Sequence, residues 1–176
     1  MTGAQIKEAA EQYIDEFIDD LEALAAINRG LGIIGDLALV YDDAQITVNP
    51  GQENTWIDLP ADLTTIREVV TSSDLLTYTC WRQRDGLISF RDPGEYIVYY
   101  RRLPRAIKNI TDTPEVHPAW HQVLVTFLIA YWKLKDDDEN PDGLRHYQLF
   151  REEVQRVFHT LSRNRGPGRV TVIRHA

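Results

Sequence analysis

The 176-residue sequence contains a single cysteine, Cys80, which excludes an intrachain disulfide. We interpret Cys80 as a small buried side chain in a strand and assign it no redox role. The sequence contains no glycine-rich nucleotide fingerprint, no Walker lysine, no HExxH and no GxSxG motif. No nucleophile pairs visibly with a base. We therefore predict that the chain is not an enzyme and uses no cofactor.

Long hydrophobic runs are also absent. The most apolar stretch, residues 123–132, is too short to cross a bilayer, which requires about 20 apolar residues. The amino terminus lacks the basic and apolar pattern of a signal peptide. We therefore expect an intracellular product without a membrane partner.

Acidic side chains stop at Glu153, whereas five arginines follow it. Residues 1–60 hold 12 acidic and 2 basic side chains, and residues 61–176 hold 15 acidic and 17 basic ones. An acidic head and a basic tail favour head-to-tail association or docking on another charged protein. The alternative is that both are simply solvated faces.

A helical hairpin is predicted over residues 117–161. Its first arm is apolar on nearly every side, so we expect a buried helix. An acidic turn follows, in which Asn140 can cap the second arm with Pro141 at its first position. The second arm carries one apolar stripe at steps of three and four residues: Tyr147, Phe150, Val154, Val157, Phe158 and Leu161.

The first predicted element is one amphipathic helix over residues 2–28. Its apolar positions recur at helical spacing, from Ile6 through Phe17 to Leu24. Its outer face is unusually acidic and includes Glu8, Asp15, Asp19 and Glu22. We expect a short second helix within residues 36–43.

The middle of the sequence changes to a β pattern. Residues 45–103 predict an antiparallel meander of about five or six strands, with Asp85-Gly86 as a hairpin turn. Apolar residues occupy both faces of the strand at residues 95–100, which favours a sandwich, a small barrel or a sheet covered by a partner. Because the strands form one block between helical blocks, the fold class is α+β.

Two weak metal motifs occur in the predicted hairpin. Residues 138–143 resemble the first half of a calcium loop, but Leu149 stands where the bidentate glutamate is needed. His117 and His121 lie four residues apart without a third ligand that is known to approach them. We therefore predict a capped turn, two partly exposed histidines and no metal site.

Nucleic-acid binding has modest support from Arg101, Arg102, Arg105 and Lys108, which stand beside two tyrosines. The pI of about 5.1 argues against a dedicated DNA binder, so docking to protein is the preferred use of these arginines. The basic tail alternates weakly in a β-prone pattern, which suits strand pairing, and a frayed terminus is the alternative.

Several stretches of the chain together resemble bacteriophage head-to-tail adaptor proteins, also called head-completion or connector proteins, and in particular the tubular adaptors of short-tailed phages. The similarity covers residues 21–158. It is carried by residues 26–36 (AINRGLGIIGD), 59–63 (LPADL) with Ile66, 90–104 (with PGEY and YYRRLP), 114–121 (with HPAWH), and the apolar helix with its Asp-Asp-Glu-Asn turn.

This resemblance implies a helical bundle of residues 1–44 and 112–162, with an antiparallel β domain at residues 45–111 inserted into it. Residues 163–176 then form an extended, flexible C-terminal arm that docks on the portal protein through Arg163, Arg165, Arg169, Val170, Val172 and Arg174.

The resemblance also implies a structural role in the virion, after assembly in the host cytoplasm. It further implies a homo-oligomeric ring, commonly a dodecamer, that lies under the portal, extends the channel for genomic double-stranded DNA without reading its sequence, and offers a platform to the next tail or neck component. In such a ring we expect the acidic residues Glu8, Asp15, Asp19 and Glu22 to face a neighbouring subunit or the channel, an inference from charge alone. Two alternatives are another neck or tail protein, such as a tail terminator or stopper, and a nucleic-acid-binding module.

Overall fold

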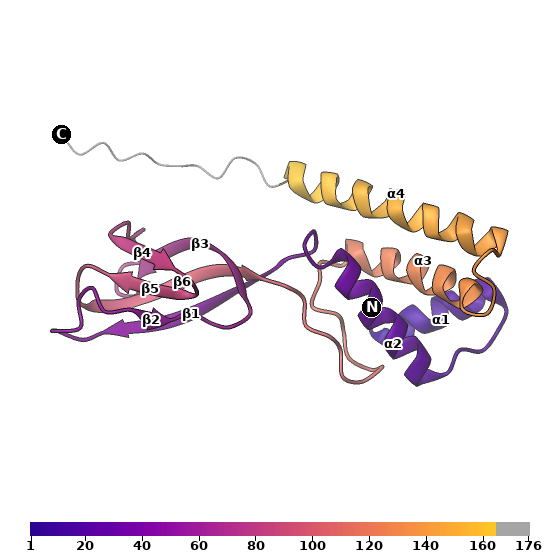
Figure 1. Cartoon of the computed structure of the whole chain (residues 1–176), viewed down its shortest axis with the longest axis horizontal. Helices are drawn as coiled ribbons and strands as arrows, with labels where there is room; N and C mark the ends of the chain where they lie inside the picture. The colour runs from indigo at the N-terminus through magenta and orange to yellow at the C-terminus, as the bar shows by residue number, and fades with distance from the viewer. Residues whose placement is uncertain (165–176) are drawn as a thin grey trace. The chain divides into compact units, whose positions relative to one another are not determined.

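The computed structural model describes residues 1–164, which contain four helices and two three-stranded antiparallel sheets (Figure 1). The predicted α+β class is therefore confirmed. The described chain divides into two compact units. The helical unit comprises Met1–Ala38 and the chain from Arg105 onward, and the β unit comprises Leu39–Pro104.

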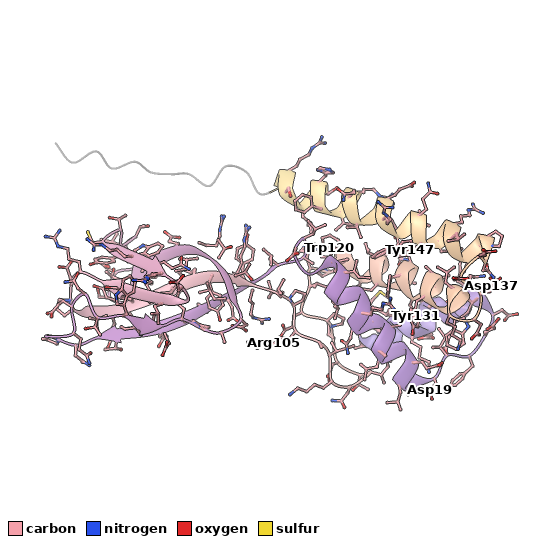
Figure 2. All side chains as sticks on the ribbon, viewed as in Figure 1. Asp19, Arg105, Trp120, Tyr131, Asp137 and Tyr147 are labelled. Atoms are coloured by element: carbon pink, nitrogen blue, oxygen red, sulfur yellow. The ribbon has the colours of Figure 1, made fainter. Side chains whose placement is uncertain are left out.

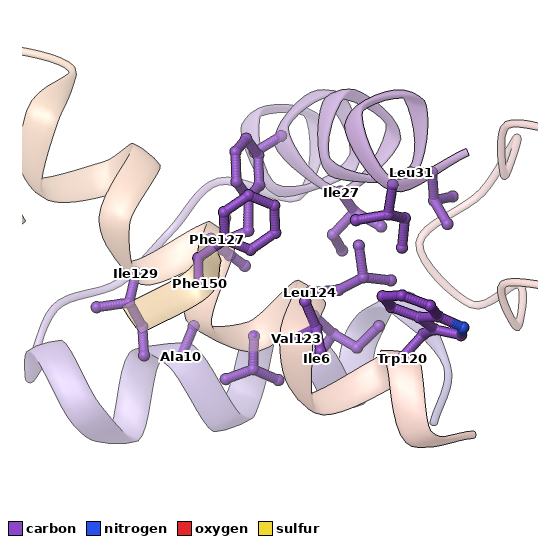
Figure 3. Close-up of a cluster of buried hydrophobic side chains, with 14 of the residues drawn as sticks. Ile6, Ala10, Ile27, Leu31, Trp120, Val123, Leu124, Phe127, Ile129 and Phe150 are labelled. Atoms are coloured by element: carbon purple, nitrogen blue, oxygen red, sulfur yellow. The ribbon is translucent and has the colours of Figure 1, made fainter. Parts of the chain in front are cut away.

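The helical unit is built around one central helix, α3. Every residue from Val123 to Ala130 is buried, because α1, α2 and α4 all pack against α3 (Figure 3). The predicted all-round apolar helix is thus confirmed. The four helices of this unit are α1 (Gly3–Ile14), α2 (Asp20–Ile34), α3 (Ala119–Leu134) and α4 (Pro141–Asn164).

The single amphipathic helix predicted for residues 2–28 is wrong, because the chain breaks between α1 and α2. Asp15 ends α1 in the left-handed conformation, with φ of 57°. Asp19 then starts α2, since its carboxylate accepts a hydrogen bond of 2.8 Å from the Leu21 N–H. Two apolar residues of the predicted stripe, Phe17 and Leu21, consequently leave the core and are exposed.

The turn between α3 and α4 has the predicted cap. The Asn140 side-chain oxygen accepts hydrogen bonds of 3.0 Å from the N–H groups of Asp142 and Gly143. Pro141 is the first residue of α4, where its missing N–H costs nothing. Phe150 and Val154 of α4 are buried against the unit's core, whereas Tyr147 is more than one-third exposed.

The β unit is organised around β6, which pairs with two strands distant in sequence. One sheet has the order β1-β6-β3 and the other has the order β2-β5-β4, all antiparallel. The predicted meander order is therefore wrong for the first sheet, where β1 pairs with β6. The strands are β1 (Val40–Val48), β2 (Ile57–Asp58), β3 (Leu63–Thr71), β4 (Trp81–Arg84), β5 (Leu87–Phe90) and β6 (Gly94–Arg102).

The predicted hairpin at Asp85-Gly86 is confirmed. Arg84 pairs with Leu87, so the two residues between them form the whole turn, with φ of 47° and 80°. Positive φ at both positions matches the twist of the flanking strands. Side chains from both sheets share one core, which confirms the sandwich alternative: Ile46, Val48, Leu59, Val69, Ile88, Phe90, Tyr96 and Val98.

Two further local predictions are wrong. The short helix expected within residues 36–43 does not form, because Val40 to Asp43 belong to β1 and pair with β6. Cys80 is exposed and lies outside the strands. After the turn that follows Thr71, Thr77 forms an isolated bridge with Val70. Cys80 comes just before β4, where its carbonyl accepts a hydrogen bond of 3.0 Å from the Arg91 N–H while the residue stays exposed.

Candidate interaction surfaces

The four acidic residues singled out in the sequence lie on both sides of the break between α1 and α2. Glu8 is exposed in the middle of α1, and Asp15 is exposed at its C-terminal cap. Asp19 caps α2, and the Glu22 carboxylate lies 3.5 Å from the Lys135 ammonium. Because the helix axis changes at the break, these residues do not form a single stripe on one helix.

The C-terminal arm lies almost entirely beyond the described residues. Arg163 is exposed in the last turn of α4. The other docking residues predicted for the arm fall outside the described part of the chain: Arg165, Arg169, Val170, Val172 and Arg174. A basic side chain in the last turn of a helix is favourable because the helix carbonyls carry partial negative charge there.

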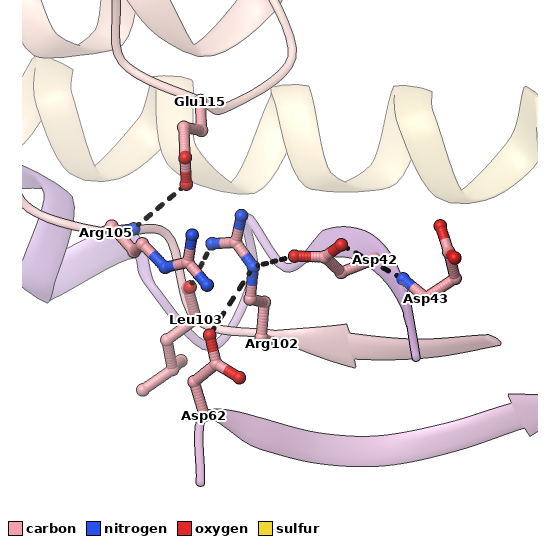
Figure 4. A network of polar contacts seen from close by, with 7 residues as sticks. All are labelled: Asp42, Asp43, Asp62, Arg102, Leu103, Arg105 and Glu115. Atoms are coloured by element: carbon pink, nitrogen blue, oxygen red, sulfur yellow. Dashed lines mark hydrogen bonds and ion pairs between the residues drawn. The ribbon is translucent and has the colours of Figure 1, made fainter. Parts of the chain in front are cut away.

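Arg102 is a structural residue of the β unit. It is only 4 % exposed, and its Nε lies 2.7 Å from an Asp42 carboxylate oxygen and 3.7 Å from Asp62 (Figure 4). Its Nη1 donates to the Leu103 carbonyl oxygen at 3.2 Å. A buried arginine held in this way joins β1 and β6, so it is not offered to nucleic acid.

Arg101 lies on the other face of β6 and meets Tyr41. Its Nη2 donates a hydrogen bond of 2.8 Å to the Tyr41 hydroxyl oxygen, and its guanidinium carbon lies 5.1 Å from the centre of the tyrosine ring. The basic cluster suggested by the sequence is thus divided, since Arg101 and Arg102 serve different faces of the sheet.

Hydrogen bonds to α2 hold the loop that precedes α3 within the helical unit. The Asn28 side chain of α2 accepts from the Ile107 N–H at 2.9 Å and donates to the Ile107 carbonyl at 3.0 Å. The Asp112 carboxylate accepts from the N–H groups of Asn109 and Lys108, and these bonds lower the pKa of Asp112. The exposed Lys108 therefore stands on an ordered loop.

The two histidines at the start of α3 have different environments. His117 is exposed and precedes the helix, and its Nδ1 accepts a hydrogen bond of 3.2 Å from the Ala119 N–H. His121 is buried, with its Nδ1 2.6 Å from the Met1 amino nitrogen, and burial lowers its pKa. Within residues 1–164 no group of three or more His, Cys, Asp or Glu side chains is placed to hold a metal ion.

Two of the three side chains at the ligand positions of the calcium-like loop, Asn140 and Asp142, are already engaged. Asn140 caps α4, and the Asp142 carboxylate pairs with the Lys133 ammonium, which lowers the pKa of Asp142. The predicted interpretation as a capped turn between helices is therefore confirmed.

Sequence reasoning missed a groove in the helical unit, between α2 and α4. Two neighbouring hollows share Ile33 and Tyr147, and the larger measures about 830 Å³. Tyr131 of α3 lines the smaller hollow, and both Tyr131 and Tyr147 are labelled in Figure 2. We call it the α2–α4 groove; its lining includes Arg29, Ile33, Tyr131, Lys135, Leu144, Tyr147, Arg151 and Glu152.

The sequence shows that residues of this groove are apolar, but it does not show whether they are buried or exposed. Tyr147 belongs to the apolar stripe of α4, and Ile33 belongs to the apolar run after Gly30. Tyr147 was predicted to belong to the apolar stripe of α4, whereas no burial was predicted for Ile33, which is 48 % exposed. Within the described residues, no helix combines the length and apolar character needed to cross a membrane.

These features describe a fold with ordered polar networks and open apolar surfaces. The family model described as SU10 adaptor protein matches residues 1–172. The chain belongs to this family of phage adaptors. No curated protein matches the chain significantly.

Family membership confirms the resemblance to phage head-to-tail adaptors. The match also extends beyond the residues 21–158 that carried the resemblance, and it includes α1 and most of the C-terminal arm. The adaptor is thus a structural protein of a phage virion by family.

Proposed function

We propose that the adaptor forms a ring under the portal protein at the head-tail junction, where it extends the DNA channel and carries the next tail component. The observation that supports this proposal is the family match over residues 1–172. A homo-oligomeric ring, with a dodecamer as the expected size, follows from the same resemblance. Genomic DNA passes through the ring without sequence-specific contacts.

We further propose that the C-terminal arm docks on the portal through its arginines and valines. The described part of α4 runs to Asn164, which gives a boundary for testing the arm. Removal of residues 165–176 leaves every described helix complete. A truncation at this point therefore separates docking by the arm from damage to α4, and Arg163→Ala tests the remaining arginine on its own.

The test uses DNA-filled, tail-less heads of the phage and the purified full-length adaptor. We expect saturable cosedimentation at one site per head, with loss of binding when residues 165–176 are removed. Circular dichroism of the truncated chain provides the control for folding. Binding that is unchanged by truncation would refute the role of the arm, and absence of binding by the folded full-length chain would refute the adaptor proposal itself.

The four acidic residues are proposed to face a neighbouring subunit or the channel, where negative charge repels DNA and eases its passage. Reversing Asp19 would also remove the cap of α2, so it is a poor test residue. Glu8 is exposed on α1, and Glu8→Lys changes charge in the middle of a helix. If Glu8 lines the channel, this variant slows DNA ejection from assembled particles. An unchanged ejection rate would show that Glu8 does not line the channel.

A further inference from the structure

The connection between α1 and α2 holds two large apolar side chains in solvent. Phe17 and Leu21 are each 76 % exposed, although Ile18 between them is fully buried. We call this feature the apolar corner, defined by Phe17 and Leu21. The two residues stand four positions apart in the chain, and exposed apolar patches, rather than single exposed side chains, mark sites of interaction with other molecules.

The apolar corner is held rigidly. The Ile18 N–H donates to the Glu11 carboxylate at 2.8 Å, and the Trp132 indole N–H of α3 donates to the Glu16 carboxylate at 2.8 Å. The Lys7 ammonium lies 4.4 Å from the centre of the Phe17 ring. Because the backbone on both sides is fixed, the exposure of Phe17 is preorganised, and binding through it costs little conformational entropy.

The α2–α4 groove has the complementary shape and chemistry. Ile33, Leu144 and Tyr147 provide partly exposed apolar surface in a hollow that is large enough for aromatic and aliphatic side chains. Its lining carries Arg29 and Arg151 against one acidic residue, Glu152, while a third basic residue, Lys135, is already paired with Glu22 of the same copy. Residues 15–22, which surround the apolar corner, carry five acidic side chains and no basic one. Opposite charges around matching apolar surfaces favour one orientation of docking.

The corner and the groove are different but neighbouring surfaces of the same unit, since Glu22 beside the corner pairs with Lys135 of the groove lining. Leu21 lies at the start of α2 and Ile33 lies near its end, about 18 Å apart along the helix axis. Neither Phe17 nor Leu21 belongs to the groove lining. A contact between corner and groove therefore joins two copies through different surfaces, and repetition of such a contact closes a ring when the rotation allows it.

We propose that the apolar corner of one copy inserts Phe17 and Leu21 into the α2–α4 groove of a second copy. This inference rests on the proposed ring and assigns the surfaces through which neighbouring subunits meet. Asp15 and Asp19 then face Arg29 and Arg151 of the neighbour, which gives these two acidic residues a role between subunits rather than in the channel.

The test is disulfide cross-linking of the full-length adaptor bound to tail-less heads. The exposed Cys80 is first replaced by serine. Leu21→Cys in the corner is then combined with Gln148→Cys in the groove lining, so that Phe17 and the apolar lining stay intact. Leu21→Cys with Gln122→Cys is the matched control, because Gln122 is exposed on α3 outside the groove.

On a denaturing gel without reductant, the corner–groove pair is expected to give a ladder of covalent multimers, and the control pair is expected to stay monomeric. Retention on heads without a ladder would overturn the corner–groove contact and leave the proposed function intact. Absence of retention of the Cys80→Ser parent, which keeps both Phe17 and Leu21, would overturn both. Dimers formed by Leu21→Cys alone would show a symmetric corner contact and would also contradict the proposal.

A substitution of Phe17 tests the same contact through the amount of adaptor bound rather than through cross-linking. Phe17→Asp should lower the amount of adaptor retained on heads by about tenfold or more, as truncation of a central aromatic anchor does. Leu149→Asp, at an exposed position of α4 outside the groove lining, should change it less than about twofold. Equal losses in the two variants, with both chains folded, would overturn the role of Phe17.

Discussion

The helical unit and the β unit are each organised around one central element, but the two elements are enclosed in different ways. α3 is buried continuously from Val123 to Ala130, because three helices surround it. β6 alternates between buried and more exposed residues, because one of its faces packs on the second sheet. The difference teaches that a fully apolar run and an alternating run can both mark the centre of a unit.

The partners of the two central elements also differ in sequence separation. α4 follows α3 after a short capped turn, whereas β1 pairs with β6 across more than 40 intervening residues. Local signals therefore identify α3 and α4 together. β1 and β6 pair along nine residues of each strand, and Arg102 of β6 adds ion pairs to Asp42 and Asp62, which lie far from it in the sequence.

The largest expected effect concerns the centre of the helical unit. Leu124 is fully buried beneath α2, so Leu124→Ala should lower the free energy of unfolding by about 2–5 kcal/mol. Hydrogen exchange should show lost protection in α3, with β6 keeping its protection if the two units unfold separately. An equal loss of protection in β6 would show that the two units do not unfold separately.

The next effect concerns the buried arginine of the β unit. Arg102→Met removes the positive charge between Asp42 and Asp62, whose side chains are about one-third exposed. Water can reach these carboxylates, so we expect a loss of about 1–3 kcal/mol, less than for a fully buried pair. Urea denaturation measures this loss. A stability equal to wild type would show that Arg102 does not hold β1 against β6.

Two glycines of α2 allow a test of how closely α2 packs against α3. A Cβ at Gly30 would lie 2.9 Å from Phe127 and 3.0 Å from Leu124, whereas a Cβ at Gly32 would meet no atom within 4 Å. We expect Gly30→Ala to destabilise by about 1 kcal/mol, since crowding exceeds the gain in helix propensity. Gly32→Ala should stabilise by up to about 1 kcal/mol.

Thermal unfolding of both glycine variants provides the measurement. Opposite signs for the two substitutions would confirm that α2 approaches α3 most closely at Gly30. Stabilisation by both would mean that Phe127 moves aside easily and that the contact between the two helices is loose.

The smallest effect is a pH dependence that belongs to the helical unit alone. Burial lowers the pKa of His121 in the folded chain, whereas the unfolded value is about 6.5. The stability contribution is therefore present above about pH 6.5 and is lost as pH falls from there through the folded pKa. His121→Gln should flatten this part of the stability–pH curve, and His117→Gln, at an exposed position, should not. Identical curves for both variants would contradict this assignment.

Much of the fold followed from the sequence where a local signal was sufficient. Asn140 with Pro141 predicted the cap of α4, and Asp85-Gly86 predicted the β4–β5 turn, because in each case adjacent residues define the backbone conformation. The break at Asp15 was missed, because the helical spacing of apolar residues continues through Phe17 to Leu21 while the backbone does not.

The candidate surfaces were less predictable than the fold. Phe17, Leu21 and Ile33 fit an apolar stripe as well as true core residues do, and only the packing of α2 shows which of them reach solvent. Cys80 was misplaced for a related reason, since it lies next to the β4–β5 pair, with its carbonyl bonded to the Arg91 N–H, but is exposed. Exposure depends on partners from distant parts of the chain, which the periodicity of one segment does not report.

The central claim is that the adaptor forms a ring under the portal, with each subunit contacting the next through different surfaces. A reconstruction of the vertex of tail-less heads, before and after addition of the full-length adaptor, tests this claim most directly. We predict a closed ring of added density at one vertex, contacting the portal, in which α1–α2 of each subunit meets α2–α4 of its neighbour. An unchanged vertex, despite a folded adaptor in excess, would contradict the claim.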